Sequence, residues 1–197
     1  MHAHAVTNPG AALLACMQRI AAAGLSQGSS GNASVRSAKG FWITPTGIPP
    51  QRMHADDAVE IDPGGRVLAG TLRPSSEWPM HAAIYRARPD AQAIVHCHSR
   101  HATALACCGR DIPAFHYMVA VAGGDSIRCS PYALFGSQAL AGQAVAALRE
   151  RRACLLGNHG QIAIGDSLES ALALAIEVEE LAAQYGAALA IGEPRLL

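Results

Sequence analysis

Two histidines separated by one residue follow an apolar run in the stretch AIVHCHSRH, residues 93–101. On an extended strand successive side chains alternate between faces, so His96 and His98 point the same way and Cys97 points away from them. Neutral imidazole is the commonest metal ligand in proteins. Two ligands bind an ion weakly, so a metal site here requires further ligands from elsewhere in the chain.

His159 and Glu77 are the candidates for the third and fourth ligands. His159 lies in LLGNHGQIAIG, framed by small residues between two apolar segments, as in a tight turn. Glu77 lies in PSSEW at a predicted helix start, where the helix dipole favours a carboxylate. Three imidazoles and one carboxylate suit zinc, although manganese, cobalt or iron accept the same set. His81, on the same helical face as Glu77, ranks second, as a packing histidine or one that supports a ligand.

The remaining histidines are weaker candidates. His101 falls one helical turn beyond the strand end and fits a partly exposed helix residue better than a ligand. His2 and His4 form a second His-x-His pair, but chain termini are commonly frayed. Spacing alone therefore leaves a three-histidine site and scattered core and surface histidines about equally supported.

Three short stretches are typical of anion binding. Ser75 and Ser76 offer hydroxyl and backbone N–H groups at a helix N-terminus, where a phosphate is well received. The loop Gly28–Asn32 lets the backbone approach a ligand closely. Together with Thr46 and Gly47 in ITPTGIPP, these stretches gain weight only if the fold brings them to one place.

The composition indicates one soluble globular domain over residues 1–197, with 50% hydrophobic and 15% charged residues. Fifteen basic and fifteen acidic side chains cancel, so no net charge attracts nucleic acid or an anionic membrane. The sequence has neither a secretion signal nor an apolar stretch that spans a bilayer. We therefore expect a cytoplasmic protein whose six cysteines are reduced and mostly buried.

Helical and extended patterns alternate along the chain and predict a mixed α/β fold. The turn Asp-Pro-Gly-Gly within VEIDPGGRVLAG joins antiparallel neighbours, which argues against a doubly wound parallel sheet. Ser99 and Gly109 are expected to cap one helix, and Asp166 and Glu169 have capping-box spacing at the start of another. Helices are predicted over residues 10–24, 75–89, 99–109, 136–152 and 166–190, and the clearest strands over 41–50, 59–70, 91–98, 153–158 and 161–165.

Several separated motifs resemble the class II aldolase and adducin family, and the likeness covers nearly the whole chain. The resemblance implies a three-layer α/β fold, with a central, mainly antiparallel sheet flanked by helices, and a ring of four subunits with sites between them. The motifs are, in order, SQGSSGNASVR, ITPTGIP, PSSEW, VHCH, HYMVAVAGGDSIRCSPYALFG and LLGNHG.

The resemblance also implies a chemistry, which is zinc-dependent, reversible aldol cleavage of a ketose 1-phosphate such as L-fuculose 1-phosphate. The products are dihydroxyacetone phosphate and an aldehyde. Glu77 is expected to shuttle a proton at C3, and Tyr117 to reach a neighbouring subunit's site and exchange a proton with the C4 hydroxyl. The implied zinc ligands are Glu77, His96, His98 and His159, and the implied phosphate-binding residues are Gly31, Asn32, Thr46, Gly47, Ser75 and Ser76.

Other activities of the family remain alternatives, namely 4-epimerisation, dehydration and decarboxylation of sugar phosphates, because a fold does not fix the reaction. An epimerase needs acid and base groups on both faces of its aldehyde, and only Tyr117 is identified, which favours an aldolase. A non-catalytic, adducin-like interaction module is disfavoured by the complete ligand set. Relatives continue into a C-terminal segment that helps close the site, whereas this sequence stops at GEPRLL, so we expect altered aldehyde specificity.

Overall fold

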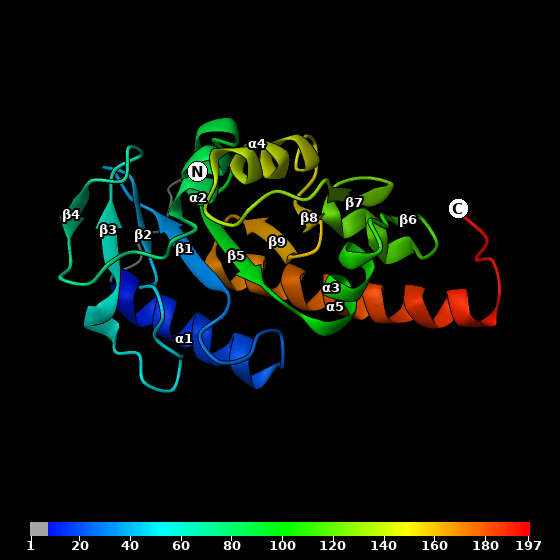
Figure 1. Cartoon of the computed structure of the whole chain (residues 1–197), viewed down its shortest axis with the longest axis horizontal. Coiled ribbons are helices and arrows are strands. Elements are labelled where there is room, and N and C mark those ends of the chain that lie inside the picture. Colours follow the sequence, from blue (N-terminus) through cyan, green and yellow to red (C-terminus); the bar gives the residue numbers. More distant parts are fainter. Residues whose placement is uncertain (1–7) are drawn as a thin grey trace.

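The computed structural model describes residues 8–197. A mixed sheet forms the centre of this part of the chain (Figure 1). Within those residues its nine strands follow the order β4-β3-β2-β1-β5-β9-β8-β7-β6. Neighbours are antiparallel except β7 and β8, which are parallel. The strands are β1 Asn32–Arg36, β2 Phe41–Ile43, β3 Val59–Ile61, β4 Val67–Ala69, β5 Ala93–Cys97, β6 Ile112–Pro113, β7 Ser126–Ser130, β8 Ala153–Leu156 and β9 Gly160–Gly165.

Helices cover both faces of this sheet. Helices α1, α3 and α5 contribute to one apolar core, and α2 and α4 contribute to the other, on the opposite face. The predicted three-layer, mainly antiparallel arrangement is confirmed. The helices are α1 Pro9–Ala22, α2 Trp78–Ala87, α3 Arg100–Cys107, α4 Gln138–Ala147 and α5 Leu168–Ile191, with short 3₁₀ helices η1 Ala55–Asp57 and η2 Tyr117–Ala122. No helix within residues 8–197 is long and apolar enough to cross a membrane.

Strand β5 shows how the two cores fix side-chain direction. Ala93, Val95 and Cys97 belong to the core shared with α1, α3 and α5, whereas Ile94 belongs to the core shared with α2 and α4. Because side chains alternate along a strand, His96 faces the α2 layer together with Ile94. Cys97 is fully buried and points away from His96, as the sequence predicts.

The start of α5 differs from the predicted capping box. Ser167 is the N-cap, and its hydroxyl accepts a hydrogen bond from the Ser170 backbone N–H, while the Ser170 hydroxyl accepts one from the Ser167 N–H. Asp166 lies one residue earlier and accepts from the Ser170 hydroxyl, and Glu169 instead forms an ion pair with Arg19 of α1. The Asp166–Glu169 assignment is therefore wrong by one residue at each end.

The cap of α3 comes from a distant helix. Ser99 occupies the N-cap position as predicted, but its hydroxyl accepts a hydrogen bond from Gln161 Nε2 and caps nothing. The free N–H groups of His101 and Ala102 donate instead to the two carboxylate oxygens of Glu179 in α5, at 2.9 and 3.0 Å. A carboxylate at a helix N-terminus satisfies unpaired donors and complements the helix dipole. Glu179 thereby joins the two helices beneath the end of β5.

We expect Glu179→Ala to lower the free energy of unfolding by about 1–2 kcal/mol, because two helix N–H groups lose their acceptor. Urea unfolding followed by circular dichroism measures this change. Glu180→Ala is the matched control, because Glu180 is exposed and, among residues 8–197, accepts only from Gln184 one turn along the same helix. Equal stabilities of the two variants would contradict the capping role.

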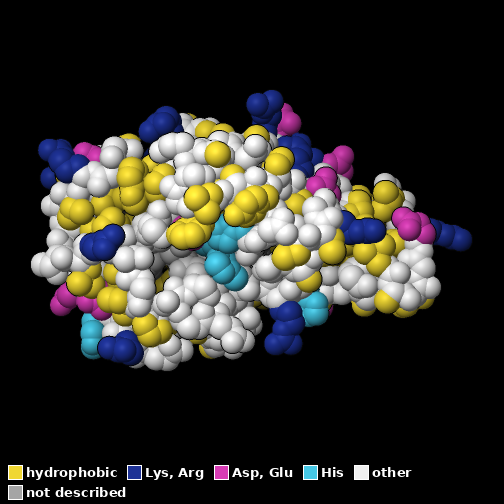
Figure 2. Space-filling model, viewed as in Figure 1, with side chains coloured by type: hydrophobic (Ala, Val, Ile, Leu, Met, Phe, Trp, Pro, Cys, Tyr) yellow, Lys and Arg dark blue, Asp and Glu magenta, His cyan; other side chains and the backbone are white. Residues whose placement is uncertain are grey.

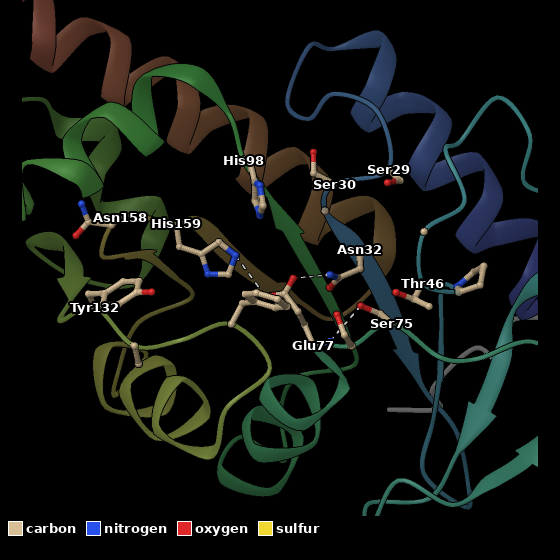
Figure 3. Close-up of a pocket in the computed structure, with 16 residues that line it drawn as sticks. Ser29, Ser30, Asn32, Thr46, Ser75, Glu77, His98, Tyr132, Asn158 and His159 are labelled. Atoms are coloured by element: carbon tan, nitrogen blue, oxygen red, sulfur yellow. Dashed lines mark hydrogen bonds and ion pairs between the residues drawn. The ribbon is translucent and has the colours of Figure 1, made fainter.

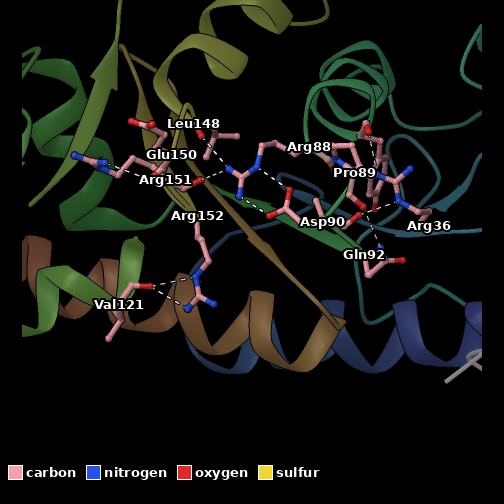
Figure 4. Close-up of polar contacts among 12 residues, drawn as sticks. Arg36, Arg88, Pro89, Asp90, Gln92, Val121, Leu148, Glu150, Arg151 and Arg152 are labelled. Atoms are coloured by element: carbon pink, nitrogen blue, oxygen red, sulfur yellow. Dashed lines mark hydrogen bonds and ion pairs between the residues drawn. The ribbon is translucent and has the colours of Figure 1, made fainter. Parts of the chain in front are cut away.

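The end of α4 also differs from the prediction, which continued this helix to Arg152. The helix ends at Ala147, because the side chain of Arg88 donates to the carbonyl oxygens of Leu148 and Arg151 and holds the following segment against the end of α2 (Figure 4). Arg36 similarly donates to three carbonyl oxygens around the end of α2. Half-buried arginine side chains thus replace a further helical turn.

Candidate metal centre and active site

Four side chains from three separate elements meet at one point. Glu77 is the N-cap of α2, His96 lies near the end of β5, His98 follows that strand, and His159 lies in the turn between β8 and β9. Their ligand atoms all lie within 4.8 Å of one another. In Figure 3, Glu77 lies beneath His159 and His98, with its carboxylate between His159 and Asn32. The fold therefore brings together the four residues that the sequence proposes as ligands.

The three imidazoles face a common centre. Each pair of rings has its centroids 4.8 Å apart, with planes at 68–71° to one another. The Nε2 atoms of His96 and His98 are 2.9 Å apart, and Glu77 Oε2 lies 3.1 Å from His96 Nε2. Glu77 Oε1 lies 3.3 Å from His159 Nε2. Four ligands held tetrahedrally on one zinc ion would lie roughly 3.3 Å apart, which is close to these separations.

The surroundings of the cluster also fit a cation. His96 is fully buried, and its Nδ1 lies 2.9 Å from the backbone oxygen of Gln161, so a proton on Nδ1 leaves the Nε2 lone pair facing the cluster. Among the described residues, the buried Glu77 Oε1 has no hydrogen-bond donor. A buried polar atom without a partner is costly, and a metal ion at the centre would compensate it.

The electrostatics favour the metal-binding forms of Glu77, His98 and His159. For His96, burial is outweighed by the Glu77 carboxylate, which raises the pKa. Burial by itself raises the pKa of Glu77, but the imidazoles of His96 and His159 and the amide of Asn32 outweigh it and hold this pKa well below its usual range. Burial and then His96 lower the pKa of His98 and of His159 to about 4, so both rings are neutral at pH 7. A carboxylate and neutral imidazoles are the protonation states that bind a divalent cation.

Two glycines allow the backbone to approach the cluster closely. At Gly31, where φ is +81°, an added Cβ would lie 2.8 Å from the His96 carbonyl oxygen. At Gly160, an added Cβ would lie 2.5 Å from the Cys97 carbonyl oxygen and 3.0 Å from the ring of His98. A side chain at either position would push the loop or strand β9 away from the ligands.

A cavity of about 340 Å³ opens directly beside Glu77, His98 and His159. Figure 2 shows histidine side chains at the bottom of a hollow near the middle of the visible face, with hydrophobic side chains beside it. One wall carries all six residues that the sequence proposes for phosphate binding, and Ser29 and Ser30 beside them (Figure 3). The six residues are Gly31, Asn32, Thr46, Gly47, Ser75 and Ser76. Their hydroxyl groups and small side chains suit a small anionic ligand.

The other proposed site residues lie elsewhere. Tyr117, at the start of η2, is 71% exposed and does not line the cavity of its own chain. His101 is exposed on α3, and His2 and His4 lie outside the described residues.

The opposite wall of the cavity is less polar, and its residues are absent from the site deduced from the sequence. Tyr132, Ala133 and Phe135, between β7 and α4, form its apolar part, and Asn158 lies beside His159. The run SPYALFG, residues 130–136, carries three large apolar side chains in a segment without regular periodicity. Large apolar side chains outside a regular element can mark a binding surface, and this was the only sequence feature that could have indicated the wall.

Replacing a ligand should weaken metal binding. We expect His98→Ala to lower the affinity for zinc by more than about 100-fold. Replacing a residue that only hydrogen-bonds to a metal ligand already lowers metal affinity by about 10–100-fold, and loss of a ligand itself should cost more. His101→Ala is the matched control, since it removes a nearby imidazole outside the cluster. Competition with a zinc-chelating dye measures both affinities, and equal values would remove His98 from the site.

The three-layer fold and the cluster of imidazoles with a carboxylate are features of a metal-dependent α/β enzyme. Residues 11–185 match the family model described as the class II aldolase and adducin N-terminal domain. The chain therefore belongs to the class II aldolase and adducin family, and its relatives identify it as an aldolase, an enzyme of the lyase class.

Curated relatives carry two different substrate names. The chain is 52% identical over 171 residues to an L-fuculose phosphate aldolase of Escherichia coli strain K12, covering 87% of this chain and 79% of that protein. It is 48% identical over 185 residues to a 5-methylthioribulose-1-phosphate/5-deoxyribulose-1-phosphate aldolase of Rhodospirillum rubrum, covering 94% and 83% respectively. A solved L-fuculose 1-phosphate aldolase superimposes with a TM-score of 0.94 at 39% identity, covering 98% of this chain and 92% of its own.

Proposed function

We propose that this aldolase cleaves a ketose 1-phosphate to dihydroxyacetone phosphate and an aldehyde, with zinc as the resident metal. The observation that carries the proposal is that the Glu77–histidine cluster adjoins a cavity, and that one wall of this cavity is rich in serine and glycine. Such a wall suits a phosphate through hydroxyl and backbone N–H groups. The reacting carbons of a bound ketose phosphate would then lie next to the cluster.

Glu77, His96, His98 and His159 would hold the metal, which when bound supplies Lewis-acid stabilisation of negative charge on the ketose oxygens. In the cleavage direction the C3–C4 bond breaks, and its electron pair stays on C3 as an enediolate. The C4 hydroxyl loses its proton and becomes the aldehyde carbonyl. A proton taken up at C3 balances the one lost from the C4 hydroxyl. Glu77 belongs to the cluster and lines the cavity, so its carboxylate is placed to take a proton from water and deliver it to C3.

Tyr117 is proposed to accept or return the proton of the C4 hydroxyl in a neighbouring subunit's site. Its phenol is 71% exposed on η2 and lies outside its own chain's cavity, which suits a role across an interface. This assignment requires the homotetramer that the family resemblance implies, with sites between subunits. We also propose the cytoplasm as the place of action.

The sugar is proposed to be either L-fuculose 1-phosphate or a 5-substituted ribulose 1-phosphate, following the names of the relatives. Both end in an apolar group, a methyl or a methylthio group, at the far end from the phosphate. Tyr132, Ala133 and Phe135 form an apolar wall opposite the phosphate-binding residues, which suits such an end. Epimerase, dehydratase or decarboxylase chemistry is the second candidate, and product analysis separates it from aldol cleavage.

The first test is dihydroxyacetone phosphate release from a panel of ketose 1-phosphates, before and after chelation and zinc restoration. We expect release that chelation abolishes and zinc restores, and much weaker release from the same ketoses without phosphate. Coupled glycerol-3-phosphate dehydrogenase measures the product. A zinc-loaded protein that consumes the sugars without forming this triose phosphate would favour the second candidate.

Glu77→Gln tests the proton-transfer role. The amide keeps the shape of the carboxylate and one oxygen ligand but cannot take up a proton, so we expect residual metal binding and a fall in kcat of about 100-fold or more. Steady-state rates at saturating zinc measure the loss. Exchange of solvent deuterium into C3 of dihydroxyacetone phosphate provides an independent measurement. If Glu77→Gln exchanged deuterium at the wild-type rate, the proton-transfer role of Glu77 would be wrong.

A further inference from the structure

Behind Glu77 lies a set of four buried polar side chains, of which only Asn32 also lines the cavity. Asn32 and Ser34 alternate on the face of β1 that meets α2, and His81 and Tyr85 follow Glu77 on α2 at intervals of four residues. Ser34 and His81 are completely buried, Asn32 is 3% exposed, and Tyr85 is 5% exposed. We call Asn32, His81, Ser34 and Tyr85 the polar series.

Three short contacts link its members to one another, and a fourth links Asn32 to Glu77. Asn32 Nδ2 lies 2.9 Å from Glu77 Oε2, and Asn32 Oδ1 lies 2.6 Å from His81 Nε2. His81 Nδ1 lies 2.7 Å from Ser34 Oγ, which in turn lies 2.8 Å from the Tyr85 hydroxyl. The series thus connects the cluster to a tyrosine two helical turns further along α2.

The direction of every hydrogen bond follows from the carboxylate. An ionised Glu77 can only accept, so the Asn32 amide presents its NH₂ to Glu77 and its oxygen to His81. His81 Nε2 must then carry the proton, and Nδ1 of the neutral ring must accept from the Ser34 hydroxyl. Burial lowers the pKa of His81 to about 3, which agrees with a neutral ring. Ser34 in turn accepts from Tyr85.

The series does not carry protons to Glu77, because an amide N–H cannot pass a proton along. Its effect is geometric. A reversed Asn32 amide would direct its oxygen at the Glu77 carboxylate and its NH₂ at the Nε2–H of His81. Ser34 disfavours that reversal, because its hydroxyl donates to Nδ1 and so stabilises the His81 tautomer that carries its proton on Nε2. Glu77 is therefore held through Oε2, while Oε1 faces His159 and has no hydrogen-bond donor among residues 8–197.

We propose that His81, Ser34 and Tyr85 are positioning residues that fix the Asn32 amide, and through it the Glu77 carboxylate, for metal binding and proton transfer. The inference rests on the proposed role of Glu77. It assigns a function to residues that touch neither the cluster nor the reacting carbons. Neither Ser34 nor His81 lines the cavity, so direct contact with a substrate does not explain any effect of changing them.

Ser34→Ala is the sharpest test, because it removes the hydroxyl that stabilises this His81 tautomer by donating to Nδ1, and it leaves the cavity wall unchanged. We expect zinc affinity and kcat each to fall by roughly 10–100-fold, the range found for partners of metal ligands, with KM for the ketose phosphate unchanged. Tyr85→Phe should produce a smaller fall in the same direction, because Ser34 can still donate to His81. Nitrogen NMR of the metal-free protein should show His81 protonated on Nε2 in the wild type and a changed tautomer ratio in Ser34→Ala.

Thr103→Val is the matched control, because Thr103 Oγ1 is a buried hydroxyl oxygen without a hydrogen-bond partner among the described residues. Thermal unfolding midpoints show whether each variant folds. Zinc affinities of Ser34→Ala and Tyr85→Phe within twofold of the control, with an unchanged His81 tautomer, would overturn the proposal. The zinc affinity and the His81 tautomer ratio are measured without substrate. They therefore test the role of the polar series even if no ketose phosphate is cleaved and the proposed function fails.

Discussion

The site depends on the burial of one carboxylate among three imidazoles. Glu77 is 7% exposed and His96 is fully buried, so the charge of Glu77 has lost most of its hydration. Such a charge is tolerated only where hydrogen bonds and opposite charge replace the lost water. Asn32 supplies one hydrogen bond, and a cation bound between Glu77 and the histidines would supply the opposite charge. The positions of all elements that carry one of these groups are therefore constrained, because each group must lie within contact distance of the Glu77 carboxylate.

The register of the central strands meets this constraint. Strand β5 lies between β1 and β9, and His96 is paired with Asn32 on one side and Ile162 on the other. A shift of β5 by one residue would turn His96 into the core beneath α3 and α5 and bring Cys97 towards Glu77. Apolar residues on both faces of β5 oppose that shift, because it would exchange the members of two packed cores.

Local patterns in the sequence predicted most of this arrangement. The His-x-His pair on a strand end, the histidine in a tight turn and the carboxylate at a helix start each follow from short-range rules, and the fold brings them together. Contacts between distant residues were not predictable, among them Glu179 with α3 and Asn32 with Glu77. The polar series did leave a pattern, because Glu77, His81 and Tyr85 recur every four residues, but its partners on β1 are not identified by periodicity. Residues 110–136 lack clear periodicity, which is why the parallel strand β7 was missed.

The two walls of the cavity differ in how firmly the fold holds them. The Glu77–histidine cluster and the serine and glycine wall belong to strand ends, a helix start and tight loops packed on the central sheet. Tyr132 and Phe135 belong to the segment between β7 and α4 and are 62% and 63% exposed. Substitutions there disturb few buried contacts, whereas substitutions in the cluster remove compensation from a buried charge. Substitutions in the apolar wall can therefore accumulate without removing the groups that compensate the charge of Glu77.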